Sequence, residues 1–182
     1  MPLKTDVVAD TTTTNGFQLN STNQYFIDTT GKTDLTDISG AKWAKLAAGI
    51  SSITPSSNET TNNDAYYDGG AFGSNDVTGK RPQWAFSGHR VIGDKGQDYV
   101  ASHEFAVGDA LKTRFLWINT EGNMIVAEVT MLSIVVTGGN ANAKQTMSFT
   151  LGANGAPVVP QGKPTLKASE DGTYTLETTL PA

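Results

Sequence analysis

The sequence predicts a mainly β protein: an antiparallel β-sandwich or partly open barrel with one flanking α-helix, a long inter-strand loop and extended terminal arms. Threonine is abundant and charged residues are few, a composition that favours strands over helices. Several segments alternate apolar and polar residues with a period of two, as half-buried strands do. A longer helix is indicated only after Asp94, where an N-cap residue precedes apolar residues three to four positions apart.

The length and composition fit a single domain without disulfides. The chain has 182 residues and no cysteine, which excludes thiolate metal sites and suits folding in a reducing cytosol. We assign residues 1–160 to the domain and 161–182 to a C-terminal arm. The first ten residues contain no apolar signal-peptide core, and no apolar stretch approaches the roughly 20 residues of a membrane helix. We therefore expect synthesis in a cytoplasm and no membrane insertion.

The first third of the chain predicts short elements. In order, we expect an N-terminal arm (1–16), a strand late in 17–28, one or two helical turns over 40–48 and a short strand over 50–53. The helical turns are predicted from Asp37 and Ser39, which are both good N-cap residues.

Residues 55–82 form the long loop, which is polar, rich in glycine and without hydrophobic periodicity. Most connections have about 4–6 residues, and structureless loops longer than about 12–15 are usually functional or disordered. We therefore expect something outside the monomer to order this segment, which we interpret as an assembly loop.

The second half has clearer strand patterns. We expect a strand over 83–92, a helix from 95 to about 105, a hairpin of 113–119 and 123–136, a strand over 143–151 and one possible strand over 173–178 within a polar tail. Near Val136 both faces of the hairpin's second arm are apolar, so we expect this end to be covered on both sides.

Enzymatic motifs are incomplete, so we expect no catalytic, cofactor or metal site. His89 and His103 lie on different predicted elements, and no cysteine can complete a zinc site with them. The Ser-x-x-Lys pattern at Ser39 lacks its companion motifs. The glycines of 69–73 lack the strand–turn–helix setting of a phosphate-binding loop.

Charge argues against tight binding of nucleic acid. The net charge is −5, with nine acidic residues and four lysines in residues 1–79 and a balance of charges in 80–182. Proteins that hold DNA by its phosphates normally carry a basic excess. Transient contact with DNA remains compatible with this sequence.

Aromatic residues of the long loop suggest a binding surface. Tyr66, Tyr67 and Phe72, together with Trp84, suit either stacking on a sugar or anchoring of a protein contact, where Tyr and Trp are enriched. The lack of a signal peptide favours the protein contact. A carbohydrate-binding or adhesin β-sandwich stays the alternative function.

Several short motifs occur in a fixed order over about residues 40–160. They are Trp43…Leu46…Gly49-Ile50-Ser51-Ser52-Ile53-Thr54-Pro55, Asn58-Glu59, Tyr66-Tyr67-Asp68-Gly69-Gly70, Val77-Thr78-Gly79, Phe86-Ser87-Gly88-His89-Arg90, Gly93-Asp94…Gln97-Asp98-Tyr99, Gly138-Gly139 and Gly155-Ala156-Pro157. In order and spacing this set resembles the major tail protein (tail tube protein) of long-tailed, non-contractile phages infecting Gram-positive bacteria.

The resemblance implies a structural protein without catalysis. In that family six copies close into a ring, rings stack into a tube, and four strands per copy line a channel through which genomic DNA passes. It also implies partners at the tube ends (tape measure, tail terminator and distal tail proteins) and a place in the virion tail, assembled in the host cytoplasm. A distal tail or tail-completion protein is the alternative within this class.

This assembly gives the long loop a role, because the loop would dock on the neighbouring ring. Our interface candidates are Glu59, Asp64, Tyr66, Tyr67, Asp68, Phe72, Asp76, Lys80, Arg81, Arg90 and Lys95. We expect the acidic members to meet a basic patch formed by the lysines and arginines. The channel candidates are the polar faces of the 113–136 hairpin and the 144–151 strand, with Glu128 as the candidate residue.

Overall fold

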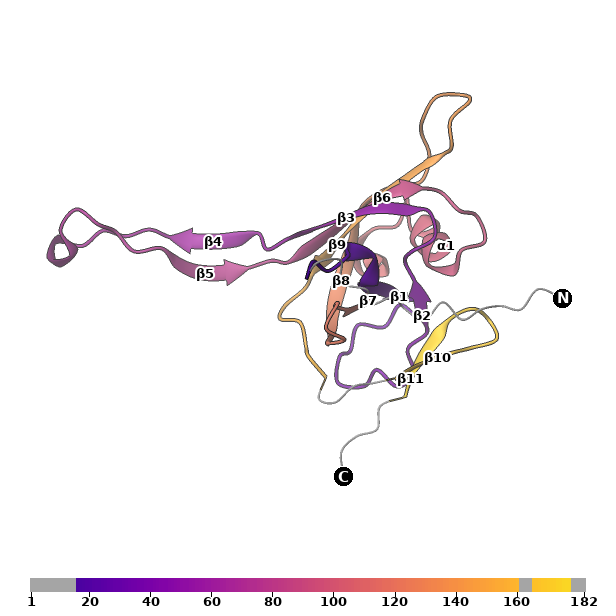
Figure 1. Ribbon diagram of the computed structural model, residues 1–182, viewed down its shortest axis with the longest axis horizontal. Helices are drawn as coiled ribbons and strands as arrows, with labels where there is room; N and C mark the ends of the chain where they lie inside the picture. The colour runs from indigo at the N-terminus through magenta and orange to yellow at the C-terminus, as the bar shows by residue number, and fades with distance from the viewer. Residues whose placement is uncertain (1–15, 161–164, 178–182) are drawn as a thin grey trace.

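The structure, a computed structural model, describes residues 16–160 and 165–177. Its body is one nine-stranded sheet in the order β10-β11-β2-β1-β7-β8-β9-β6-β3, with antiparallel pairing throughout, and β4 and β5 form a separate two-stranded ribbon (Figure 1). The predicted fold class is confirmed: the described chain is mainly β with one α-helix, and the sheet does not close into a barrel.

The elements are short apart from β8. The strands are β1 (Gln24–Asp28), β2 (Trp43–Lys45), β3 (Ile50–Ser56), β4 (Glu59–Asn62), β5 (Asp76–Lys80), β6 (Gln83–His89), β7 (Lys112–Ile118), β8 (Met124–Val135), β9 (Thr146–Ala153), β10 (Thr165–Ala168) and β11 (Tyr174–Glu177). The helix is α1 (Lys95–Ser102), and the 3₁₀ turns are η1 (Asn20–Thr22), η2 (Tyr67–Gly69) and η3 (Gly108–Leu111).

The sheet curls around the main hydrophobic core. Tyr25 of β1 packs edge-on against Phe86 of β6, with ring centroids 5.8 Å apart, although β7, β8 and β9 separate these strands in the sheet. The ring centroids of Trp84 on β6 and Phe115 on β7 lie 4.8 Å apart in the same core. Val100 of α1 is fully buried against this cluster, so the helix packs on the core face of the sheet.

The opposite face of the sheet is covered over only part of its width. A second cluster contains Phe26, Trp43, Leu116 and Val126, and the loop 29–42 packs over it through partly buried apolar side chains. Residues of β10 and β11 join the same cluster. Among the described residues, the cover therefore lies over β2, β1, β7 and the first half of β8, and this face stays open over β9, β6 and β3.

The helical turns predicted over 40–48 are wrong, because this segment contains strand β2. Asp37 does accept hydrogen bonds from the backbone N–H and hydroxyl of Ser39, but these bonds close a local turn instead of capping a helix. Trp43 and Ala44 then point to opposite faces and fill the two hydrophobic clusters. Pairing with β1 thus outweighs the local helix signal.

The predicted helix after Asp94 and the predicted hairpin are confirmed. Asp94 accepts a hydrogen bond from the Gln97 backbone N–H at 2.9 Å, as an N-cap residue does, although α1 ends earlier than expected. Gly96 permits close packing on β2, since a Cβ there would lie 2.7 Å from the Lys45 carbonyl oxygen. The hairpin β7–β8 pairs Lys112 with Thr130 through to Ile118 with Met124.

The far end of β8 is not covered on both sides, contrary to our expectation. Leu132 is 37% exposed and Val135 is 46% exposed. The register shifts between these two residues, with Ser133 in the left-handed region at φ 50°. Because β7 begins opposite Thr130, the last residues of β8 extend past it, and no other strand in the described part of the subunit pairs there.

Some expected features fall outside the described residues or were missed. The N-terminal arm, apart from its last residue, lies outside them. The possible strand in the tail is present as β11, but β10 was not predicted, since only Leu166 among its four residues is a large apolar residue. Within the described ranges, no helix has the length and apolar character needed to cross a membrane.

Candidate functional site

The most prominent functional feature is an arm formed by residues 57–82 between β3 and β6. Our prediction of a structureless loop over 55–82 is wrong in detail, because β3 extends to Ser56 and strands β4 and β5 pair with each other. Figure 1 shows the arm projecting from the body of the subunit. At about 3.3 Å per residue, the two extended sides of the arm, 57–62 and 76–82, each span roughly 20 Å below its tip.

Polar contacts hold the two strands of the arm together. Glu59 faces Lys80 in the register, and the carboxylate and ammonium lie 2.9 Å apart. The Thr78 hydroxyl donates to the Thr60 carbonyl at 3.2 Å. Every residue of β4 is exposed, so the ribbon has no buried face and its sequence has no apolar alternation. This explains why the pattern did not predict these strands.

The tip of the arm, residues 63–75, is organised around Asp64. Its carboxylate accepts hydrogen bonds from the Asn62 amide at 2.8 Å and the Tyr66 hydroxyl at 3.4 Å. Its carbonyl oxygen accepts from the backbone N–H of Ser74 at 3.2 Å, which joins the two sides of the tip. The tip is therefore a defined structure that the subunit body does not support.

Three aromatic side chains of the tip are uncovered. Tyr66 is 65% exposed, Phe72 is 86% exposed, and Tyr67 is exposed as fully as in an isolated residue. Trp84, which we grouped with them, is 4% exposed and lies in the main core against Phe115. The four side chains predicted as a sugar-stacking set therefore do not form one surface.

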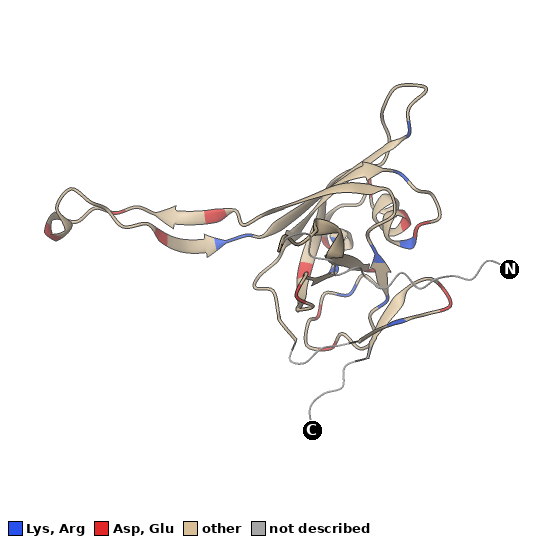
Figure 2. Cartoon of the chain, viewed as in Figure 1, with Lys and Arg blue, Asp and Glu red and all other residues tan. Residues whose placement is uncertain are grey.

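The charged interface candidates divide into paired and available groups. Lys80 pairs with Glu59 inside the arm, and Arg90 forms an ion pair with Asp98 of α1. Arg81 and Lys95 form no salt bridge with any described residue of the subunit. Figure 2 shows the acidic and basic positions along the arm.

The acidic candidates near the tip also differ in whether their carboxylates have a partner inside the subunit. Asp76 accepts a hydrogen bond from the Ser74 hydroxyl at 2.9 Å, and Asp64 is engaged as described above. Asp68 lies in η2 and makes no hydrogen bond or salt bridge with a described residue. Its carboxylate is thus the one most available to a partner.

A second feature is the open face of β3, β6, β9 and the end of β8, which we call the hydroxyl face. Cross-strand register places its residues in three rows, Ser52–Ser87–Ser148–Val135, Thr54–Ala85–Thr150–Leu132 and Ser56–Gln83–Gly152–Thr130. These rows contain no Lys, Arg, Asp or Glu. The opposite side chains, such as Phe86 and Phe149, fill the main core.

The four strands of the hydroxyl face end in two edges. On one side, β3 pairs only with β6 among the described strands. A groove of about 450 Å³ follows this edge and is lined in part by Tyr25, Ile50 and Ile53. On the other side, the end of β8 extends past β7 and exposes Leu132 and Val135. Sequence patterns did not identify these edges, since they depend on strand order.

Glu128, our channel candidate, lies at the margin of the hydroxyl face. It is half-buried, its carboxylate accepts a hydrogen bond from the Asn154 amide at 3.2 Å, and the same amide donates to the Thr130 hydroxyl at 2.8 Å. Residues 154–158 cross the sheet here, with Val158 bridging to Val126. The carboxylate is therefore next to the open face without belonging to its three rows.

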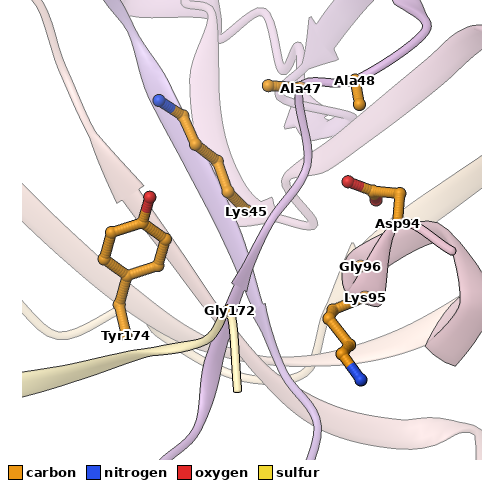
Figure 3. A pocket seen from close by; sticks show the side chains of 8 residues that line it. All are labelled: Lys45, Ala47, Ala48, Asp94, Lys95, Gly96, Gly172 and Tyr174. Atoms are coloured by element: carbon orange, nitrogen blue, oxygen red, sulfur yellow. The ribbon is translucent and has the colours of Figure 1, made fainter. Parts of the chain in front are cut away.

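The remaining surface offers no convergent chemistry. A pocket of about 290 Å³ lies between β2, the start of α1 and the β10–β11 turn, and Figure 3 shows its two amines, on Lys45 and Lys95, pointing away from each other. His103 bonds through Nδ1 with the Tyr99 carbonyl at 2.8 Å. Within residues 16–160 and 165–177, no three His, Cys, Asp or Glu side chains are grouped as metal ligands.

Comparison with known proteins places the fold among tail proteins. No family model matches the sequence, and no curated protein matches it. The structure is similar to a chain in the tail of an empty gene transfer agent particle, obtained by helical refinement with C6 symmetry. That match has a TM-score of 0.61 and 15% identity, over 79% of this chain and 99% of that chain.

Two further solved structures are similar. A chain in the virion of the native gene transfer agent particle matches with a TM-score of 0.54 and 14% identity, over 79% of this chain and 99% of that chain. A chain in the activated phage p2 baseplate with Sr matches with a TM-score of 0.41 and 15% identity, over 80% of this chain and 46% of that chain. The protein therefore has the fold of a protein in the tail of gene transfer agent particles.

Proposed function

We propose that this protein is the structural subunit of a phage tail tube, in which six copies form a ring and stacked rings conduct DNA. The observation that carries the proposal is the arm, a long ordered hairpin with three uncovered aromatic side chains at its tip. Monomeric proteins seldom extend such a feature into solvent without a partner. A similar fold occurs in a tail with C6 symmetry, which supports the same assembly.

Ring closure uses the two edges of the hydroxyl face, β3 and the end of β8. The β3 edge of one copy lies beside the end of β8 in the next, so Leu132 and Val135 are covered at the junction. A head-to-tail contact of this kind closes into a ring and removes exposed edges that otherwise invite aggregation. Six copies with four strands each give a barrel of about 24 strands, larger than the 16–18-stranded porins that leave an aqueous channel.

Stacking of rings uses the arm. The aromatic tip enters the neighbouring ring, where Tyr66, Tyr67 and Phe72 become buried as interface anchors. The carboxylate of Asp68 meets Arg81 or Lys95 of that ring, the two basic candidates that form no salt bridge with a described residue of their own subunit. Such rim charges contribute modestly to affinity and more to orientation.

The rest of the proposal follows from the sequence resemblance. The tube belongs to a long, non-contractile tail of a phage that infects Gram-positive bacteria and is assembled in the host cytoplasm. Tape measure, tail terminator and distal tail proteins are its partners at the tube ends. The protein is not an enzyme. A distal tail or tail-completion role is the second candidate, and it predicts single rings that do not stack.

Arm variants test the proposal. We expect the purified full-length protein to form long tubes, measured by sedimentation and negative-stain microscopy. Replacing Tyr66, Tyr67 and Phe72 together by Ser removes the anchors and should abolish tubes while leaving rings and the thermal unfolding midpoint unchanged. Val77→Ser, also on the arm but outside the tip, is the matched control.

Two results would contradict parts of this proposal. Tubes of normal length from the triple variant would show that the tip does not join rings. Normal assembly after Asp68→Lys, or after Arg81→Glu combined with Lys95→Glu, would contradict the proposed ionic contact alone.

A further inference from the structure

We propose that the hydroxyl face is the wall of the channel and that it contacts passing duplex DNA without holding it. The inference depends on the proposed tube and specifies which surface of the subunit lines its interior. It rests on the composition, the exposure and the location of this face.

The composition of the hydroxyl face is unsuited to a stable contact. Its three rows consist mainly of Ser and Thr and contain no charged side chain. Protein interfaces are built around aromatic and arginine anchors, and none is present here. DNA-binding surfaces present Lys and Arg to phosphates, and none is present either.

An exposed sheet face without charged side chains is unusual, and it suits a surface that lines a channel. The full sequence has 31 charged residues, 13 basic and 18 acidic, yet none falls in these rows on β3, β6, β9 and the end of β8. Lys112, which continues the third row on β7, forms an ion pair with Asp109 at 2.8 Å. Soluble proteins normally place charges on exposed surfaces. Duplex DNA carries about one negative charge per 1.7 Å, so lysines on a channel wall would hold it and acids would repel it. A neutral wall of hydroxyl groups does neither.

The apolar residues of the face fit the same arrangement. Leu132 and Val135 lie in the column on β8, at the edge where the next copy's β3 would lie. The columns away from the junction are Ser87, Ala85 and Gln83 on β6 and Ser148, Thr150 and Gly152 on β9, which are uncharged. Glu128 lies outside the rows, so the carboxylate is at the rim of the wall and not at its centre.

Cysteine accessibility tests this inference, because the chain has no cysteine of its own. Ser87→Cys places a thiol on the exposed centre of the hydroxyl face. Ser102→Cys is the matched control: Ser102 is exposed on α1, which packs on the opposite face of the sheet. Each variant is treated, as dissociated subunits and as assembled tubes, with a small maleimide and with a maleimide on a large polymer.

We expect both variants to react with both reagents as dissociated subunits. In tubes, Ser87→Cys should react with the small reagent and at least about tenfold more slowly with the large one, while Ser102→Cys should react with both. If the two variants in tubes react with the large reagent at equal rates, the hydroxyl face does not line the channel. This result would not contradict the proposed tube. Absence of any ring or tube from the wild-type protein would overturn the proposed function as well.

A charge variant checks the neutrality of the wall. Tubes of the wild-type protein should not retain duplex DNA on a filter at 50 mM salt, whereas Ser87→Lys tubes should retain it. Because six lysines per ring contact phosphates, retention should fall by at least tenfold at about 200 mM salt. Strong retention by wild-type tubes would contradict the inference.

Discussion

Arg114 of β7 and Asp28 of β1 form an ion pair in the interior of the subunit. Both side chains are fully buried, with Nη2 2.6 Å and Nε 2.8 Å from the same carboxylate oxygen. Arg114 Nη1 also donates to the carbonyl oxygens of Asp34 at 3.0 Å and Asp37 at 2.7 Å. The pair therefore fixes the loop 29–42 over the second hydrophobic cluster.

Loss of this arginine should destabilise the subunit severely. Arg114→Met leaves the Asp28 carboxylate buried without its counter-ion, which typically costs about 3–5 kcal/mol. That is a large part of the roughly 5–15 kcal/mol by which domains are stable. Denaturant unfolding measures the loss. Arg114→Lys keeps the charge without the planar fork and should lose the carbonyl contacts, giving intermediate stability. Wild-type stability in Arg114→Met would contradict this role.

Close contact between β3 and β6 requires glycine at position 88. A Cβ on Gly88 would lie 2.1 Å from the Gly49 carbonyl oxygen and 2.9 Å from the Ser51 backbone nitrogen, and backbone atoms cannot move aside cheaply. We expect Gly88→Ala to cost about 3 kcal/mol in the free energy of unfolding. Gly79→Ala on the arm is the control, since its nearest neighbour would be a Thr60 side-chain atom at 3.6 Å. Equal stability of the two variants would refute the argument.

Acid should loosen the loop 29–42. Hydrogen bonds from the Ser39 side chain and backbone hold the pKa of Asp37 below its ordinary value of 3.8, and those from the Thr36 backbone and side chain lower the pKa of Asp34. A lowered folded-state pKa means that this stabilisation is complete above the ordinary value and is lost as the pH falls through the folded-state pKa.

The melting temperature as a function of pH checks this linkage. We expect a smaller decrease below about pH 4 in the double variant Asp34→Asn, Asp37→Asn than in the wild type, because the amides do not titrate. Superimposable pH profiles for the two proteins would show that these turns do not contribute.

The exposed end of β8 should matter for assembly and not for folding. Val135→Lys adds a charge at the proposed junction between copies, where it would be buried without a partner. We expect Val135→Lys to keep the melting temperature of the wild type and to sediment as a single free subunit. Ser133 is left untouched, because its positive φ is part of the fold. If Val135→Lys still forms rings, the junction between copies does not include the end of β8.

Sequence patterns predicted the parts of the fold that local signals specify. The hairpin β7–β8 and the cap at Asp94 follow local rules, and both are confirmed. The helical turns near Trp43 were wrong because pairing with β1 is a long-range effect. The arm strands escaped prediction, since a ribbon exposed on both faces, such as β4, has no hydrophobic period.

The candidate site was predicted only in part. The tip residues Tyr66, Tyr67 and Phe72 were recognised from their residue types and are exposed as a binding surface requires. Trp84 is also aromatic, but its position on β6 directs its side chain into the main core. The hydroxyl face follows from strand order, which local patterns do not contain.

Cryo-electron microscopy of the purified full-length protein tests the central claim most directly. The account predicts hollow tubes of stacked six-membered rings, with the arm of each subunit in the next ring and the side chains of Ser87 and Thr150 facing the channel. A protein that remains monomeric at every concentration, or that forms a solid filament without a channel, would contradict it.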